Sequence, residues 1–202
     1  MKQFLVVSLG ELLSEGLDEE KIKDAFKKFS CRREEDLENF LMYKAITYEK
    51  IDFGKTYLCI DKEKLDSGEF VVLAYFCLAQ RSIDVTCISQ KARRKILGEY
   101  PGRDNLKSVP TFLIGQLGRC DDCAHEELSG EQILNECYHA ISKAAKIVGG
   151  RLVVLECREH MYEKFYEKQG YKKLYYELND EGLYTLYKRI DFKEYWKSQS
   201  NL

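Results

Sequence analysis

The sequence predicts an α+β fold built on a central sheet that is mixed but mostly antiparallel, with helices on both of its faces. Residues 70–79, FVVLAYFCLA, form the continuous apolar run that is typical of a central strand. Apolar runs at 109–117 and 152–157 flank a long amphipathic segment at 129–148, the pattern of a parallel strand pair joined by a crossover helix. A turn sequence at 179–182 separates two further strand-like runs and predicts an antiparallel hairpin.

Composition favours one globular domain over residues 1–202. The chain has 33% charged residues, two prolines and a net charge of −2, so it has neither a linker composition nor a global basic field. The apolar start, MKQFLVVSLG, is too short for a secretory signal and is followed by Gly10-Glu11 where a small-residue cleavage site should lie. Because no apolar run approaches about 20 residues, we expect a cytoplasmic protein without a membrane partner.

The first part of the chain is expected to supply a strand, two helices and a hairpin. Apolar side chains recur every three or four residues in both helical segments, which predicts that one face of each helix packs on the sheet. In order, we expect strand 1–9, helices 18–29 and 34–48, and strands 56–60 and 70–79 joined by a polar turn at 62–69.

A basic insertion, residues 82–108, separates the strands at 70–79 and 109–117. A short helix is expected at 89–97, and its cations are Lys91, Arg93, Arg94 and Lys95. Such a cluster suits the phosphate backbone of a nucleic acid. A solvated, charged helix explains the same pattern equally well.

The second part of the chain begins with its clearest helix, 129–148. Ser129 and Gln132 have the spacing of a capping box, in which each side chain bonds the other residue's amide. Gly149-Gly150 end this helix and a buried strand follows. Tyr162, Phe165 and Tyr166 then share the face of a further helix, which Gly170 ends; a polar tail, 191–202, closes the chain after the last hairpin.

The stretch Phe165–Tyr171, FYEKQGY, resembles the FYEKxGF signature of the GNAT acyltransferases. The order of elements is similar to the GNAT fold over about residues 30–190. This resemblance implies that the parallel strand pair splays apart and that acetyl-coenzyme A (acetyl-CoA) lies between its strands. It also implies that Tyr166 protonates the departing coenzyme A thiolate, and that Phe165 and Lys168 contribute to the cofactor site.

The family's pyrophosphate-binding turn, Q/R-x-x-G-x-G/A, corresponds here to His125–Gly130, HEELSG. Gly130 agrees with that pattern, whereas His125 replaces its basic first residue and Leu128 replaces its first glycine. Glu126 and Glu127 would repel phosphate if they pointed inwards. Either Ser129, Gly130 and the helix amides suffice for the cofactor, or its binding is weak or lost; we favour the first, because a capped helix N-terminus is itself an anion site.

Two further roles are implied by the resemblance. Gln116, Leu117, Gly118 and Arg119 match positions whose backbone polarises the thioester and pairs with the pantetheine arm. An alternative is that the glycines here only mark a bulge in the strand. Glu156, just past the strand 151–155, is a candidate base for the amine, although many relatives need only water.

Cysteine usage favours buried thiols. Cys59, Cys77, Cys137 and Cys157 lie in apolar strand or helix patterns. Cys120 and Cys123, with His125 close by, have the spacing of a metal site. No fourth ligand stands out, so we expect plain loop cysteines and no metal.

The predicted function is N-acetylation of a primary amine by acetyl-CoA, through direct transfer in a ternary complex. The basic insertion and the early helices resemble the GNAT toxins of toxin–antitoxin modules, which acetylate aminoacyl-tRNA. The acceptor is left open among a small molecule, a protein and aminoacyl-tRNA, and a homodimer is left open too. The alternative is a catalytically silent GNAT-fold protein that acts as a binding module.

Overall fold

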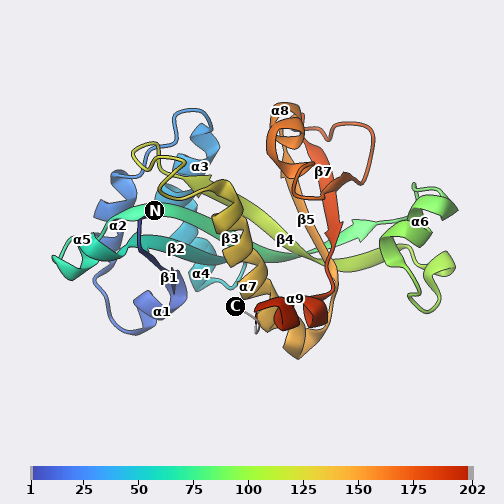
Figure 1. Cartoon of the computed structure of the whole chain (residues 1–202), viewed down its shortest axis with the longest axis horizontal. Helices are drawn as coiled ribbons and strands as arrows, with labels where there is room; N and C mark the ends of the chain where they lie inside the picture. Colours follow the sequence, from blue (N-terminus) through green and yellow to red (C-terminus); the bar gives the residue numbers. More distant parts are fainter. Residues whose placement is uncertain (1, 200–202) are drawn as a thin grey trace. The chain divides into compact units, whose positions relative to one another are not determined.

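The computed structural model describes residues 2–199, whose strands form one seven-stranded sheet in the order β1-β2-β3-β4-β5-β7-β6 (Figure 1). The strands are β1 (Phe4–Ser8), β2 (Lys55–Asp61), β3 (Val72–Asp84), β4 (Ser108–Arg119), β5 (Leu152–Cys157), β6 (Lys172–Lys173) and β7 (Tyr184–Arg189). The neighbours β4 and β5 are joined by a crossover helix, the connection that makes adjacent strands parallel. The mixed, mostly antiparallel sheet predicted from the sequence is therefore confirmed.

The helical elements include two π-helical turns and one 3₁₀ turn. The α-helices are α1 (Leu9–Ser14), α2 (Glu19–Lys27), α3 (Glu35–Asn39), α4 (Ala45–Lys50), α5 (Lys62–Asp66), α6 (Gln90–Leu97), α7 (Gly130–Val148), α8 (Glu159–Met161) and α9 (Phe192–Gln199). The π-helical turns are η1 (Phe40–Lys44) and η3 (Tyr162–Tyr166), and the 3₁₀ turn is η2 (Arg103–Asn105).

The chain consists of two compact units. Unit 1 comprises Met1–Ala79 and Ile114–Ala140, and unit 2 comprises Gln80–Leu113 and Ile141–Leu202. Three elements, β3, β4 and α7, contribute residues to both units. That all 202 residues form a single domain stays a prediction.

In unit 1, β2 pairs antiparallel with both β1 and β3, which confirms the predicted hairpin. Tyr75 of β3 is fully buried between the rings of Phe29 and Phe40, with centroid distances of 5.3 and 6.1 Å, and its hydroxyl donates to the Leu37 carbonyl at 2.7 Å. The predicted helix at 34–48 is present, but η1 interrupts it. The polar turn predicted at 62–69 is wrong in its first part, because α5 occupies it and the Asp61 carboxylate caps that helix.

In unit 2, β5 pairs antiparallel with β7 along six residues of each strand. The predicted last hairpin is confirmed, since the Gly182 amide donates to the Asn179 carbonyl at 2.9 Å and β6 pairs with β7. However, β6 holds two residues where a strand over 172–178 was expected. The C-terminal tail is likewise more regular than predicted, because α9 begins at Phe192 and the Lys146 ammonium lies 3.6 Å from the centre of the Trp196 ring; residues 200–202 of that predicted tail lie outside the described part.

The predicted insertion at 82–108 is shorter than expected. Strand β3 continues to Asp84 and β4 begins at Ser108, and α6 lies between them at the outer end of both strands (Figure 1). Helix α6 packs on the rest of unit 2, because Ile96 and Leu97 are buried in the same apolar cluster as residues of β4, β5 and β7. This segment between β3 and β4, the α6 arm (residues 85–107), is therefore a packed part of unit 2.

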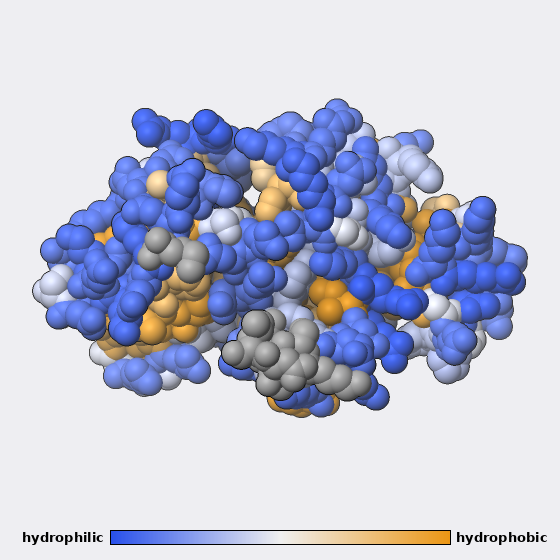
Figure 2. Space-filling view, viewed as in Figure 1, coloured by the Kyte–Doolittle hydropathy of each residue, from blue (hydrophilic) through white to orange (hydrophobic). Residues whose placement is uncertain are grey.

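The surface is mainly hydrophilic, and Figure 2 shows separate apolar patches on the face in view. The most exposed large apolar side chains of the described part include Ile147 and Tyr176. Within residues 2–199 no helix combines the length and the apolar character needed to cross a membrane. Seven of the eight cysteines are buried and Cys87 is exposed, and the burial predicted for Cys59, Cys77, Cys137 and Cys157 is confirmed.

Candidate functional site

The turn before α7, in unit 1, contains the predicted capping box. The Ser129 amide donates to Gln132 Oε1 at 2.8 Å, and the Gln132 amide donates to Ser129 Oγ at 3.2 Å. These two bonds satisfy two amides at the helix start. The next amides, of Gly130 and Glu131, belong to the first turn, where a helix offers no backbone acceptor and carries a partial positive charge. An anion at this position would meet those two amides.

Leu128, which replaces the family's glycine, is fully buried in the core of unit 1. Its carbonyl accepts a hydrogen bond from Arg119 Nη1 at 3.0 Å, so the predicted cofactor residue Arg119 braces this turn. A glycine at position 128 would remove this apolar contact. The departure from the family pattern therefore has a packing reason.

The two acidic residues of the turn have different surroundings. Glu127 accepts a bond from the Ala124 amide at 2.9 Å, and its other oxygen lies 3.6 Å from the Lys2 ammonium. Glu126 and His125 are exposed. One glutamate is thus tied into the loop and the other is open to solvent, which lessens the repulsion expected for a bound phosphate.

Strand β4 extends two residues further than predicted, so Gln116, Leu117, Gly118 and Arg119 all lie inside it, and the expected end of the strand at Leu117 is wrong. Gly118 is buried, and a Cβ atom there would lie 3.1 Å from Leu37 Cδ1 and 3.2 Å from Tyr75 Cε1. Packing against these side chains accounts for a small residue at 118, independently of the role predicted for this backbone at the thioester.

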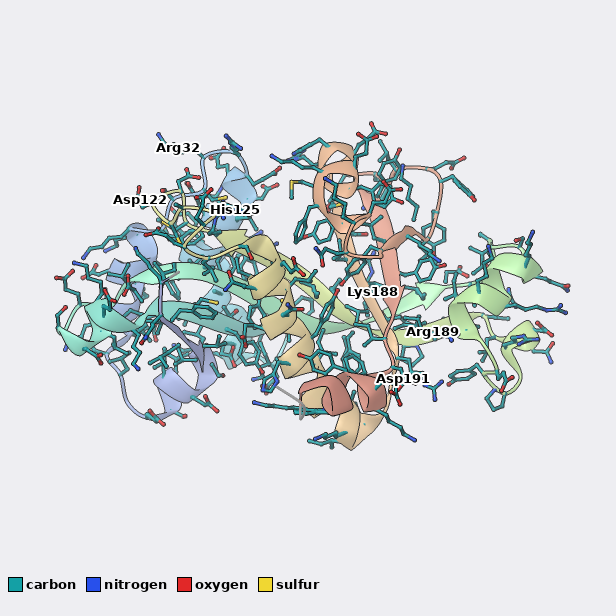
Figure 3. The ribbon with its side chains drawn as sticks, in the orientation of Figure 1. Arg32, Asp122, His125, Lys188, Arg189 and Asp191 are labelled. Atoms are coloured by element: carbon teal, nitrogen blue, oxygen red, sulfur yellow. The ribbon has the colours of Figure 1, made fainter. Side chains whose placement is uncertain are left out.

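Asp121 anchors the loop after β4 to the segment around Arg32. Asp121 accepts bonds from the Arg32 amide and Nε at 3.0 and 3.1 Å, and these bonds lower the pKa of its carboxyl group. Figure 3 shows Arg32, Asp122 and His125 on this group of loops. The Cys123 thiol is buried, which raises its pKa, and among the described residues no three His, Cys, Asp or Glu side chains gather as metal ligands.

Tyr166, in unit 2, lies in a π-helical turn that the sequence pattern did not reveal. After β5, the short helix α8 leads into η3 (Tyr162–Tyr166), where the Glu167 amide donates to the Tyr162 carbonyl at 2.9 Å, five residues back. Gly170 ends the turn with φ +81°, as predicted for a left-handed cap. Such π-turns are frequent at functional sites, because they re-aim one side chain without ending the helix.

The Tyr166 side chain is buried, with 7% of its surface exposed. Its ring packs edge-on against Phe165 at 5.0 Å and Tyr171 at 5.6 Å. Phe165 is half-buried and Lys168 is exposed. The signature stretch thus combines one tyrosine fixed by aromatic packing with a solvent-facing lysine.

Glu156 lies within β5, opposite Thr185 of β7. The strand matches the run predicted at 152–157, and the shorter bounds 151–155, which placed Glu156 past the strand, are wrong. Its Oε1 atom accepts hydrogen bonds from Asn179 Nδ2 at 3.2 Å and from Thr185 Oγ1 at 3.3 Å, and it pairs with Arg81 at 2.9 Å. No local sequence pattern indicates this pairing, because Arg81 is 75 residues away in the chain. A role as base would have to operate beside this ion pair.

The basic cluster of α6 divides into one structural residue and three exposed ones. The Arg93 guanidinium donates to the carbonyls of Val85, Arg103 and Asp104, so it ties the arm together. Lys91, Arg94 and Lys95 are exposed. Three of the four predicted nucleic-acid contacts are therefore available to a partner.

No protein-family model matches the sequence, and no curated protein matches it either. Solved structures match almost the whole chain. The structure of AtaT complexed with acetyl-methionyl-tRNAfMet is 17% identical, with a TM-score of 0.62 over 91% of this chain and 94% of that one. A tyrosine-to-phenylalanine mutant of KacT is 17% identical, with a TM-score of 0.66 over 97% and 99%, and a structure described as a bacterial toxin is 10% identical, with a TM-score of 0.70 over 100% and 98%.

The chain has the GNAT fold. At these identities the likeness concerns the fold, and it confirms both the predicted architecture and its similarity to GNAT toxins. The predicted cofactor residues between Gln116 and Gly130 belong to unit 1, and the predicted cofactor residues Phe165 and Lys168 belong to unit 2. The predicted catalytic residues, Glu156 and Tyr166, also belong to unit 2.

Proposed function

We propose that this protein transfers the acetyl group of acetyl-CoA directly to a primary amine. The observation that carries the proposal is the buried Tyr166, fixed by aromatic packing in a π-turn after β5 of a GNAT fold. AtaT, which has this fold, has been solved with acetyl-CoA. In support, a capped 19-residue helix presents its first amides at the start of α7.

Each chemical requirement of the reaction has a candidate in the chain. The leaving thiolate needs a proton, which the Tyr166 hydroxyl would donate. The thioester carbonyl needs polarisation by backbone donors, for which Gln116–Arg119 of β4 are the candidates. The amides of Gly130 and Glu131 would bind pyrophosphate, with His125, Ser129, Phe165 and Lys168 as further cofactor contacts. The amine must lose a proton, to Glu156 or to water.

Acetyl-CoA is expected to stabilise the protein against heat. A ligand at 100 times its dissociation constant adds about 2.7 kcal/mol to the free energy of unfolding. For a chain of this size, that corresponds to a rise in Tm of about 5–10 °C. Thermal unfolding of the full chain with and without acetyl-CoA measures it, and dephospho-coenzyme A, which lacks the 3′-phosphate, should give a smaller shift.

A second candidate function is a catalytically silent binding module of the same fold. The observation that favours it is the turn at Leu128–Ser129, where the leucine is buried and the capping box already uses two amides. No change in Tm at millimolar acetyl-CoA would support the silent module and contradict the transferase.

For the acceptor we propose aminoacyl-tRNA. The AtaT structure contains acetyl-methionyl-tRNAfMet, and unit 2 exposes three cations on α6, Lys91, Arg94 and Lys95, that suit a phosphate backbone. Replacing all three by glutamine should raise the KM for charged tRNA several-fold and weaken its dependence on salt. The Tm shift with acetyl-CoA should stay unchanged.

The matched control removes three exposed lysines from elsewhere, Lys21, Lys28 and Lys193. If it raises the KM as much as the α6 variant does, the effect is one of net charge and the α6 contact is wrong. Transfer of labelled acetyl groups to charged total tRNA is the assay. If acetyl-CoA binds but charged tRNA accepts nothing, the acceptor proposal fails and the cofactor proposal stands.

A further inference from the structure

Unit 2 contains a cavity of about 650 Å³ whose floor is apolar. The floor is formed by Ile96, Leu97, Val109 and Leu152, which belong to the packed core of this unit. The volume falls within the range of about 300–1,000 Å³ that is typical of small-molecule sites.

This cavity lies at the end of β5 away from the proposed catalytic tyrosine. Leu152, in its lining, is the first residue of β5, whereas Cys157, the last residue of the strand, leads into α8 and η3. At about 3.3 Å per residue, the strand alone separates the two ends by about 15 Å. The cavity is therefore not the place where Tyr166 acts.

The cavity wall contains both prolines, a left-handed glycine and two aromatic rings. Both prolines of the chain, Pro101 and Pro110, line it. Gly150, also in the lining, has φ +108°, and a Cβ atom there would lie 2.7 Å from Phe112 Cε2. The glycine thus lets the Phe112 ring form a wall, and Tyr100 adds a second, exposed aromatic ring.

Three charged residues line the cavity: Glu99, Arg151 and Arg189. Hydrogen bonds from the Glu194 and Lys193 amides lower the pKa of the Asp191 carboxyl group, and the positive charge of Arg151 lowers it further. Arg189 and Asp191 lie at the end of β7 in Figure 3. Arg151 therefore has a nearby counter-charge.

Glu99 and Arg189 differ from Arg151. Among residues 2–199, neither side chain has a hydrogen-bond or ion-pair partner. The Arg189 guanidinium is packed against α6, since a Cβ atom on Gly98 would lie 2.5 Å from its Nη1 atom. One cavity thus offers one unpaired cation, one unpaired carboxylate and an apolar floor.

We propose that this cavity binds a zwitterion with a large apolar or aromatic side chain, which is the chemistry of a free amino acid or of a short peptide with free termini. Arg189 binds the carboxylate, for which a planar guanidinium can supply two parallel hydrogen bonds. Glu99 binds the ammonium group, and the apolar floor takes the side chain. A ligand with only a carboxylate would leave Glu99 unpaired near it, so charge complementarity favours the zwitterion.

The test measures binding to the full chain by titration calorimetry, with L-phenylalanine and L-leucyl-L-phenylalanine as probes. N-acetyl-L-phenylalanine lacks the ammonium group and L-phenylalanine amide lacks the carboxylate. We expect a zwitterionic probe to bind, and each neutralised analogue to bind at least about tenfold more weakly. Tighter binding of the dipeptide assigns the site to peptides, and tighter binding of phenylalanine assigns it to amino acids.

Two variants tie the binding to the cavity. R189Q should weaken zwitterion binding at least about tenfold and leave the already weak binding of the amide unchanged. E99Q should also weaken zwitterion binding at least about tenfold, and it should leave the already weak binding of the N-acetyl analogue unchanged. Both side chains are exposed, so the Tm should stay that of the wild type. K143Q, an exposed lysine of α7 outside the cavity lining, is the control. The proposal is overturned if neither zwitterion binds at millimolar concentration, or if R189Q and K143Q behave alike.

Discussion

Replacing Tyr166 with phenylalanine is expected to lower the turnover number by about 10²–10⁴-fold, the contribution typical of a positioned general acid. The substitution removes one oxygen and keeps the ring that packs against Phe165 and Tyr171. Affinity for acetyl-CoA should therefore be unchanged. The measurements are the rate of acetyl transfer from labelled acetyl-CoA to charged tRNA and the Tm shift with acetyl-CoA.

A second tyrosine of the same π-turn offers a matched control. The Tyr162 hydroxyl donates to Glu167 Oε1 at 3.3 Å on the surface, and the protein should tolerate its loss. Tyr162→Phe should keep near wild-type turnover. Equal turnover in Tyr166→Phe and the wild type would remove the tyrosine from the mechanism. If Tyr166→Phe loses both turnover and the Tm shift with acetyl-CoA, the hydroxyl supports cofactor binding instead.

The sequence predicted elements whose signals are local. The capping box at Ser129 and Gln132 depends on four consecutive residues, and Gly170 marks a left-handed cap directly, so both could be identified without tertiary information. The last hairpin was equally local, because the turn at 179–182 supplies its own hydrogen bonds.

Features that depend on distant partners were not predictable. The π-turn η3 has the same apolar spacing as an α-helix over one turn, so periodicity does not distinguish the two. Arg93 was predicted as a phosphate contact, but three carbonyls from the surrounding arm bind it. Glu156 was expected beyond a strand that in fact continues through it, and its partner Arg81 comes from β3.

The turn before α7 shows how a family motif can change without losing its helix. The expected glycine is needed where the backbone must adopt a conformation that other residues resist. Here the carbonyl of Leu128 accepts a bond from Arg119, its amide donates to the Ala124 carbonyl at 3.2 Å, and its side chain fills the core. The position therefore carries a stability role where the family carries a binding role.

Leu128→Ala is accordingly expected to lower the free energy of unfolding by about 2–5 kcal/mol, the range for truncating a fully buried leucine. The loss has two parts, the apolar surface no longer removed from water and the cavity left behind. At about 2–4 °C per kcal/mol for a chain of this size, Tm should fall by several degrees or more. Urea unfolding of the full chain measures the change.

Ile147→Ala is the control, because this residue of α7 is 85% exposed and its truncation should cost no more than about 0.5 kcal/mol. If Leu128→Ala were as harmless as Ile147→Ala, burial would not explain the missing glycine.

The Leu128→Ala variant also separates stability from cofactor binding. The amides of Gly130 and Glu131 do not depend on the leucine side chain, so folded Leu128→Ala should still show a Tm rise with acetyl-CoA. Loss of that rise in the folded variant would mean that core packing at 128 holds the anion-binding amides in place.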